Sequence, residues 1–274
     1  MPYVVQAPSR ELSRLAGRLE WAFVAYASAQ GVESLAPEWE APRYAWTLSK
    51  LIVRHAEATT LMARTDVAHA PSAWVTARAC VETAARSLWL LDPDGEWERE
   101  ARWLAFLKEG ARLGKQEHVS WLQMVVDRSQ QISGFANAVE SKLPDGIVVP
   151  TRIPTTHQML APLDPALDAF YAIASQFTHG AEYATGMFRS NLGTDAIFGE
   201  GSSEADWIIP LRHVWQAFRA TSVRLFEVGG TNAASEQLLL ADEKVKEAFQ
   251  AFIDVLDLPD PDPDPEQSVQ PSRT

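Results

Sequence analysis

The sequence has a single cysteine, no long uninterrupted apolar run and no excess of positive charge. The lone Cys80 excludes an intrachain disulfide and a metal site built from several cysteines, and we expect a buried, unreactive thiol there. No segment approaches the run of about 18 apolar residues that a membrane-spanning helix needs, so we expect no membrane partner. The basic segment and apolar stretch of a signal peptide are also missing from the N-terminus, which predicts a cytoplasmic protein.

Acidic residues outnumber basic ones by 36 to 24, which gives a formal net charge of -12. Residues 257–274 hold five acids and one base, which leaves -8 on residues 1–256. An acidic body argues against a broad DNA-binding surface, although it is compatible with a local basic groove. The repeated Pro-Asp pattern of the C-terminal segment cannot bury apolar surface. We therefore expect one helical domain over 1–256 and a disordered acidic tail over 257–274.

Apolar residues recur at helical spacing along most of the chain, and Ala, Leu, Glu and Arg dominate it. The predicted helical segments are 8–30, 42–67, 71–91, 96–143, 165–190, 206–228 and 233–256. Gly110 and Gly114 are expected to bend or break the longest segment, because glycine disfavours a helix interior. Between these segments, the five prolines of 144–165 and the Gly-, Ser- and Asp-rich stretch 191–204 predict long loops. The fold class we expect is all-α: a mainly antiparallel helix bundle of about six or seven helices.

One of these helices carries three charged residues at a spacing of four, Arg78, Glu82 and Arg86. On a helical wheel, Arg78 falls inside an apolar stripe that includes Trp74 and Trp89. A guanidinium in such a stripe must be paired, because an unpaired buried charge is very costly. The sequence therefore predicts that a polar group from elsewhere in the fold faces Arg78.

The segment 170–189 offers a second unusual face, small and polar instead of rich in Lys and Glu. That face consists of Tyr171, Ser175, Thr178, His179, Glu182, Gly186 and Arg189. We expect Arg78 and Glu82 to meet part of it in one polar cluster, where His179 could act as acid or base and Arg78 could bind a phosphate or carboxylate. The alternative is a satisfied polar network that only fixes helix register.

These two segments supply every candidate site residue. The candidate catalytic residues are His179, Arg78 and Glu82, and the candidate ligand-binding residues are Arg86, Tyr171, Ser175 and Glu182. No cofactor or metal is expected, because Glu-x-x-His pairs, a Walker loop and a Rossmann glycine pattern are all absent from the sequence. The ten tryptophans fit a packed core, with Trp39, Trp97 and Trp207 expected to be the most exposed because they lie near predicted helix ends. The small-residue face of 171–189 and the surplus of Trp predict a homodimer.

Two motifs carry a family resemblance: Ala-Arg-Ala-Cys-Val-Glu-Thr-Ala-Ala-Arg-Ser-Leu-Trp-Leu-Leu-Asp-Pro at 77–93 and Tyr-Ala-Ile-Ala-Ser-Gln-Phe-Thr-His-Gly at 171–180. In these motifs the chain resembles a group of uncharacterised actinobacterial helical proteins, which are similar to the HEPN superfamily, the higher eukaryotes and prokaryotes nucleotide-binding fold. Members of that superfamily are helical bundles, often dimers, and many are metal-independent RNases of toxin–antitoxin or antiviral systems. Their catalytic signature is an Arg followed after four to six residues by a His.

His179 matches the histidine of that signature, but residues 171–178 contain no Arg. The resemblance therefore implies a non-catalytic or weakly catalytic HEPN-like binding or regulatory module, in defence or stress response, with RNA or a nucleotide as a candidate partner. A second hypothesis is a metal-independent RNA-cleaving, toxin-like enzyme in which Arg78 substitutes for the missing Arg beside His179. A third is a small-ligand pocket between helices, gated by the loop 144–165.

Overall fold

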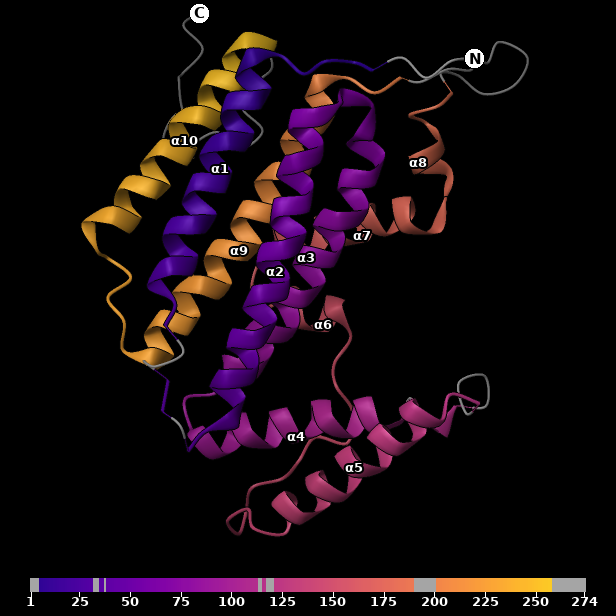
Figure 1. Ribbon diagram of the computed structural model, residues 1–274, viewed down its shortest axis with the longest axis vertical. Coiled ribbons are helices and arrows are strands. Elements are labelled where there is room, and N and C mark those ends of the chain that lie inside the picture. Colours follow the sequence, from indigo (N-terminus) through magenta and orange to yellow (C-terminus); the bar gives the residue numbers. More distant parts are fainter. Residues whose placement is uncertain are drawn as a thin grey trace, which may run out of the picture.

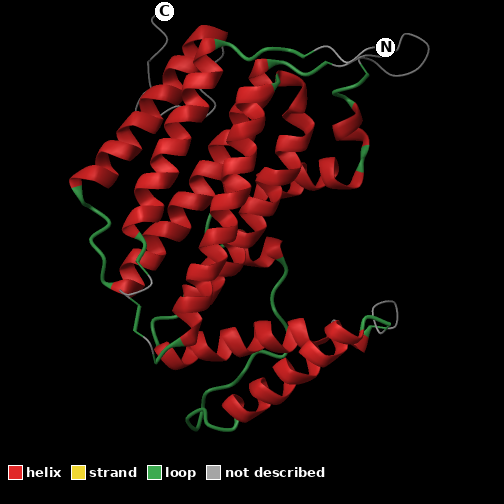
Figure 2. Ribbon diagram, viewed as in Figure 1, coloured by secondary structure: helices red, strands yellow, loops and turns green. Residues whose placement is uncertain are grey.

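A computed structural model describes residues 5–31, 35–36, 38–112, 115–116, 121–189 and 201–257. These residues form ten α-helices and no β-strand (Figure 1, Figure 2), which confirms the all-α class. The α-helices are α1 (Arg10–Ala29), α2 (Glu40–Thr65), α3 (Ala70–Leu91), α4 (Glu96–Arg112), α5 (Gln123–Glu140), α6 (Thr156–Leu160), α7 (Pro165–His179), α8 (Glu182–Thr185), α9 (Ile208–Gly229) and α10 (Glu236–Leu256). Short 3-10 helices, η2 (Val67–His69) and η6 (Glu204–Trp207), precede α3 and α9.

Five long helices, α1, α2, α3, α9 and α10, stand side by side as the bundle (Figure 1). Helix α2 runs antiparallel to α1 and α3, and α10 runs antiparallel to α1, as the sequence predicts. The exceptions are α9 with α3 and α9 with α1, which run in parallel. At one end the indole Nε1 of Trp207 donates to the carbonyl oxygen of Val67 at 3.1 Å, and at the other Arg224 donates to the carbonyl oxygen of Leu91 at 2.8 Å.

Local sequence signals set several helix ends. The Ser9 hydroxyl accepts a hydrogen bond from the Leu12 amide at 3.1 Å and caps the start of α1. Asp164 caps α7 through the Ala166 amide at 2.9 Å, with proline at the next position, so this Asp-Pro pair opens a helix as predicted. Helix α9 ends at Gly229, and the next residue, Gly230, has a φ of 65°, the left-handed conformation that glycine favours at a helix end.

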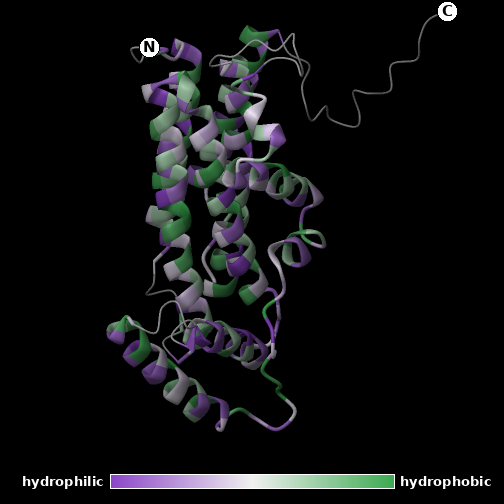
Figure 3. Ribbon diagram, turned by 90° about the vertical axis from the view of Figure 1, so that its right-hand side faces the viewer, coloured by the Kyte–Doolittle hydropathy of each residue, from purple (hydrophilic) through white to green (hydrophobic). Residues whose placement is uncertain are grey.

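The core of the bundle is aromatic where α1 meets α9. The Tyr26 ring stacks on Phe226 with centroids 5.9 Å apart and meets Trp215 and Phe218 edge-on at 5.7 and 5.9 Å. Its hydroxyl donates to the Asp242 carboxylate of α10 at 2.7 Å, so the buried ring keeps a partner for its polar end. Figure 3 shows hydrophobic and hydrophilic residues alternating along the bundle helices, as amphipathic packing requires.

Helices α4 and α5 pack on each other across one end of the bundle (Figure 1). The sequence predicts one helical stretch over 96–143, and the structure instead has two helices whose ends lie at Arg112 and Gln123. Gly110 lies inside α4, whereas Gly114 is outside the described residues. This division and the short helices α6 and α8 give ten α-helices in the described part of the chain, more than the six or seven predicted.

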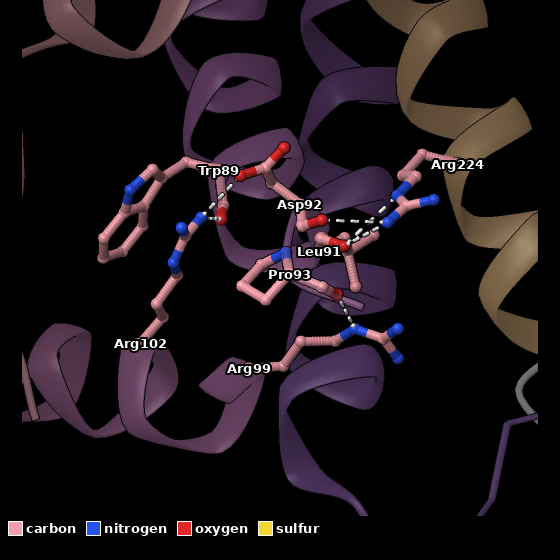
Figure 4. Close-up of polar contacts among 7 residues, drawn as sticks. All are labelled: Trp89, Leu91, Asp92, Pro93, Arg99, Arg102 and Arg224. Atoms are coloured by element: carbon pink, nitrogen blue, oxygen red, sulfur yellow. Dashed lines mark hydrogen bonds and ion pairs between the residues drawn. The ribbon is translucent and has the colours of Figure 1, made fainter. Parts of the chain in front are cut away.

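Three arginines cap the C-terminal end of α3 (Figure 4), where the last carbonyl groups of a helix lack intrahelical partners. Arg224 of α9 donates to the Leu91 and Asp92 carbonyls, with its closest contact at 2.8 Å, and Arg99 of α4 donates to the Pro93 carbonyl at 2.7 Å. Arg102 of α4 donates to the Trp89 carbonyl and forms an ion pair with Asp92 at 3.2 Å. The predicted turn at 92–95 is thus the joint between α3, α4 and α9.

Helix α7 is shorter than the predicted 165–190, because it ends at His179. The next residue, Gly180, has a φ of 62° and turns the chain out of the helix. Glu182 therefore lies on the separate helix α8, and the predicted shared polar face stops at residue 179. Among the described tryptophans, Trp97 is 42% exposed as predicted, but Trp121 is more exposed, at 76%. Trp39 is only partly exposed, and Trp207 is fully buried, with its indole nitrogen bonded to a carbonyl inside the bundle.

Two predicted segments fall largely outside the described residues: positions 191–200 of the loop 191–204, and positions 258–274 of the acidic tail. The proline-rich segment 144–165 is described, and it contains the short helix α6. Within the part of the chain that the structure describes, no helix combines the length and the apolar character needed to cross a membrane.

Candidate functional site

The candidate site starts from the charged residues of α3, and Arg78 is the residue on which it depends. Its side chain is 18% exposed and lies at the interface between α3 and α7. Its Nε donates to the Ser175 hydroxyl and one terminal nitrogen donates to the Tyr171 hydroxyl, both at 2.9 Å. The other terminal nitrogen forms an ion pair with Glu82 at 3.3 Å. The expected polar partner of Arg78 is therefore present, and it comes from α7.

The partners of Arg78 are themselves ordered by further contacts. Ser175 donates its hydroxyl hydrogen to the Tyr171 carbonyl at 2.7 Å, so its oxygen is left to accept from the guanidinium. The guanidinium carbon also lies 4.8 Å from the centre of the Tyr171 ring, within the range of a cation–π interaction. All three nitrogens of Arg78 thus have protein partners, and a bound anion would have to displace them.

His179 does not join this cluster. It lies at the exposed C-terminal end of α7, one helical turn or about 6 Å along the axis from Ser175. Among the described residues it makes no hydrogen bond or ion pair with Arg78, Glu82 or any other side chain. The predicted acid–base pair of His179 and Arg78 is therefore not assembled in the structure, because α7 carries the imidazole past the end of its contact with Arg78.

The polar cluster continues along α3 toward α4. Glu82 lies between Arg78 and Arg86, and its second carboxylate oxygen is 3.8 Å from the Arg86 guanidinium. Arg86 in turn lies 3.8 Å from Glu109 of α4. Ion pairs of this length on half-exposed side chains contribute little to stability, so their effect is mainly to align charges between α7 and α4. Glu182 takes no part, since it pairs with Arg189 at 2.7 Å beyond the end of α7.

Glu109 leads to a pocket that sequence reasoning did not locate. The pocket has a volume of about 410 Å³ and lies between α4, α5 and residues 149–153 of the proline-rich segment. Lys108 and Glu140 form an ion pair across it at 2.5 Å, and Arg112 donates to the Thr151 carbonyl at 3.1 Å. The five prolines of 144–165 indicated an unusual loop, but no sequence signal showed which helices it would meet.

The α4–α5 pocket and the α3–α7 cluster both offer charged and polar groups suited to binding. No histidine is among the described residues that line the α4–α5 pocket, and the charged groups there are Lys, Arg and Glu side chains, of which Lys108 and Glu140 form an ion pair. At the α3–α7 cluster, the groups beside Arg78 are two hydroxyls and a carboxylate that already faces two arginines. The side chains at both places can therefore hold a polar ligand through charge and hydrogen bonds.

The chain was compared with protein-family models, curated proteins and solved structures. None of the three comparisons finds a match. The assignment of function therefore depends on the chain's own geometry and on the resemblance of its two motifs.

Proposed function

We propose that this protein is a non-catalytic binding module of HEPN-like type that takes a small polar ligand in the α4–α5 pocket. The observation that carries the proposal is the pocket of about 410 Å³ closed on one side by residues 149–153. Its volume lies in the range of small-molecule sites. The polar cluster around Arg78 then serves to hold α7 on α3.

The charges of the pocket indicate the chemistry of its ligand. Lys108, Arg112 and Arg152 face Glu109 and Glu140, so cationic groups exceed anionic ones by one. Arg152 is exposed, and among the described residues it has no ion-pair partner. A ligand with an acidic group beside Arg152 and a hydroxyl or amino group beside a carboxylate would satisfy both kinds of charge.

The absence of catalysis is tested by an RNA-cleavage assay on the native chain and on His179→Ala. We expect no cleavage that depends on His179, because the imidazole and the Arg78 guanidinium do not meet. Cleavage by the native chain that the substitution abolishes would restore the alternative of an RNA-cleaving enzyme.

Ligand binding is tested by equilibrium dialysis of the native chain against a small-molecule cell extract, with mass spectrometry of the retained compounds. We expect at least one polar compound to be retained by the native chain and by Arg128→Gln, but not by Arg112→Gln. Arg128 is the matched control, since it lies on α5 but does not line the pocket. Retention that is absent, or equal in all three proteins, would contradict the proposal.

We also propose that the chain forms a homodimer, with a cytoplasmic location and a role in defence or stress response proposed from the sequence alone. Exposed apolar residues of α1 and α2 support dimerisation: Val24 is 59% and Leu61 62% exposed. The ion pair between Glu20 and Arg64 places them at one level of the bundle, one turn from each partner. Light scattering should give twice the chain mass of 30.3 kDa, with Val24→Asp monomeric and Val148→Asp, in an exposed loop, still dimeric. A native monomer would reject this proposal.

A further inference from the structure

A second groove lies between α9 and α10, on helices that contribute nothing to the α4–α5 pocket. It has a volume of about 420 Å³. This volume also lies within the usual range of small-molecule sites. Its lining differs from the first pocket in two respects, the balance of charge and the presence of aromatic rings.

The charge of the groove opposes that of the chain. Arg212, Arg219 and Lys246 line it with a single carboxylate, Asp242, so its net charge is +2 on a chain of -12. Asp242 is already neutralised, because Arg219 holds it with two hydrogen bonds of 2.9 and 2.7 Å and Tyr26 donates to it at 2.7 Å. A positive site on an acidic protein attracts small anions locally while the rest of the surface repels large ones.

Lys246 is the cation that is most available to a ligand. It is exposed on α10, and the structure gives it no ion pair among the described residues. Its neighbour Lys244 differs, since it is paired with Glu247 at 2.7 Å and does not line the groove. The two lysines therefore form a matched pair in which only one is expected to contact a ligand.

The floor of the groove is apolar and contains one unsatisfied polar atom. Trp215 and Phe249 both line it, and the Arg212 guanidinium lies 5.8 Å from the centre of the Phe249 ring. The side-chain oxygen of Gln216 is buried there without a hydrogen-bond partner. Leaving such an acceptor unpaired costs about 1–3 kcal/mol, and a donor on a ligand would remove that cost.

We propose that the α9–α10 groove is a binding site for a small organic anion, a carboxylate or a phosphate, that carries an aromatic ring and an NH or OH donor. The acidic group lies beside Lys246 and Arg212. The ring packs against Trp215 and Phe249, and the donor reaches Gln216. This site is independent of the ligand proposed for the α4–α5 pocket, so either can fail without the other.

The test uses calorimetric titration of the full chain with two pairs of probes that differ in charge: indole-3-acetate against indole-3-acetamide, and adenosine monophosphate against adenosine. We expect at least one anion to bind about tenfold or more tightly than its neutral counterpart, since a charge-assisted contact is worth about a factor of ten. Which anion binds distinguishes a carboxylate from a phosphate ligand.

The variants Lys246→Gln and Lys244→Gln locate the binding. Both residues lie on α10 and both changes remove one positive charge. We expect Lys246→Gln to weaken the anion about three- to tenfold and Lys244→Gln to leave it within about a factor of two. The proposal is overturned if neither anion binds at about 1 mM, if neutral and charged probes bind equally, or if the two variants lose affinity equally.

Discussion

Replacing Arg78 by methionine tests whether the guanidinium clamps α7 onto α3. The substitution keeps most of the aliphatic stem and removes two hydrogen bonds of 2.9 Å and an ion pair of 3.3 Å. A hydrogen bond from a charged donor contributes about 1.5–3 kcal/mol, and water reaches part of this side chain, so the total loss should be about 2–4 kcal/mol. In a chain of this length, that loss lowers the melting temperature by about 5–12 °C.

Urea unfolding followed by circular dichroism and tryptophan fluorescence measures the change in free energy of unfolding. Arg54→Met is the control, because Arg54 lies on neighbouring α2, is 77% exposed and makes one ion pair, with Glu57. It should cost no more than about 1 kcal/mol. A cycle with Tyr171→Phe should show a coupling of about 1 kcal/mol to Arg78→Met. If Arg78→Met costs no more than Arg54→Met, the clamp does not exist.

Three further changes have predictable outcomes. Arg224→Met leaves the Leu91 carbonyl without its donor and should lower the free energy of unfolding by about 1–3 kcal/mol in the same assay. Burial raises the pKa of the Glu100 carboxyl, although the Ala41 amide donates to it. The contribution of Glu100 to stability is therefore present at low pH and falls as pH rises. In urea titrations, Glu100→Gln should stabilise the protein more at pH 7 than at pH 4. Burial also raises the pKa of the Cys80 thiol, so a thiol reagent should label it only as fast as the chain unfolds.

Local rules explain why much of the fold follows from the sequence. An Asp-Pro pair starts α7, and the turn at 92–95 ends α3, because capping and proline restrict the backbone within a few residues. The pairing of Arg78 was predictable for an energetic reason, since its position in an apolar stripe left no alternative to a polar partner.

The errors arise where tertiary contacts or a single backbone angle decide the outcome. Apolar spacing continues past Gly180, yet a positive φ at that one glycine ends α7 and places Glu182 on the separate helix α8. The burial of Trp207 depends on the carbonyl of Val67, which is 140 residues away in the sequence. Each pocket is lined by side chains from different helices or loops. The sequence gives the charges of these side chains, but no local pattern in it predicts that they come together.

Helix α5 is held more loosely than the helices of the bundle. Only Ser129 and Ala136 of its residues are buried, and its main packing partner is α4. Its amide hydrogens should therefore exchange with deuterium through a local opening that leaves the five long helices intact. Because α5 also lines the α4–α5 pocket, a ligand bound there should disfavour that opening. Its binding would then be detected as slower deuterium uptake by the amides of this one helix.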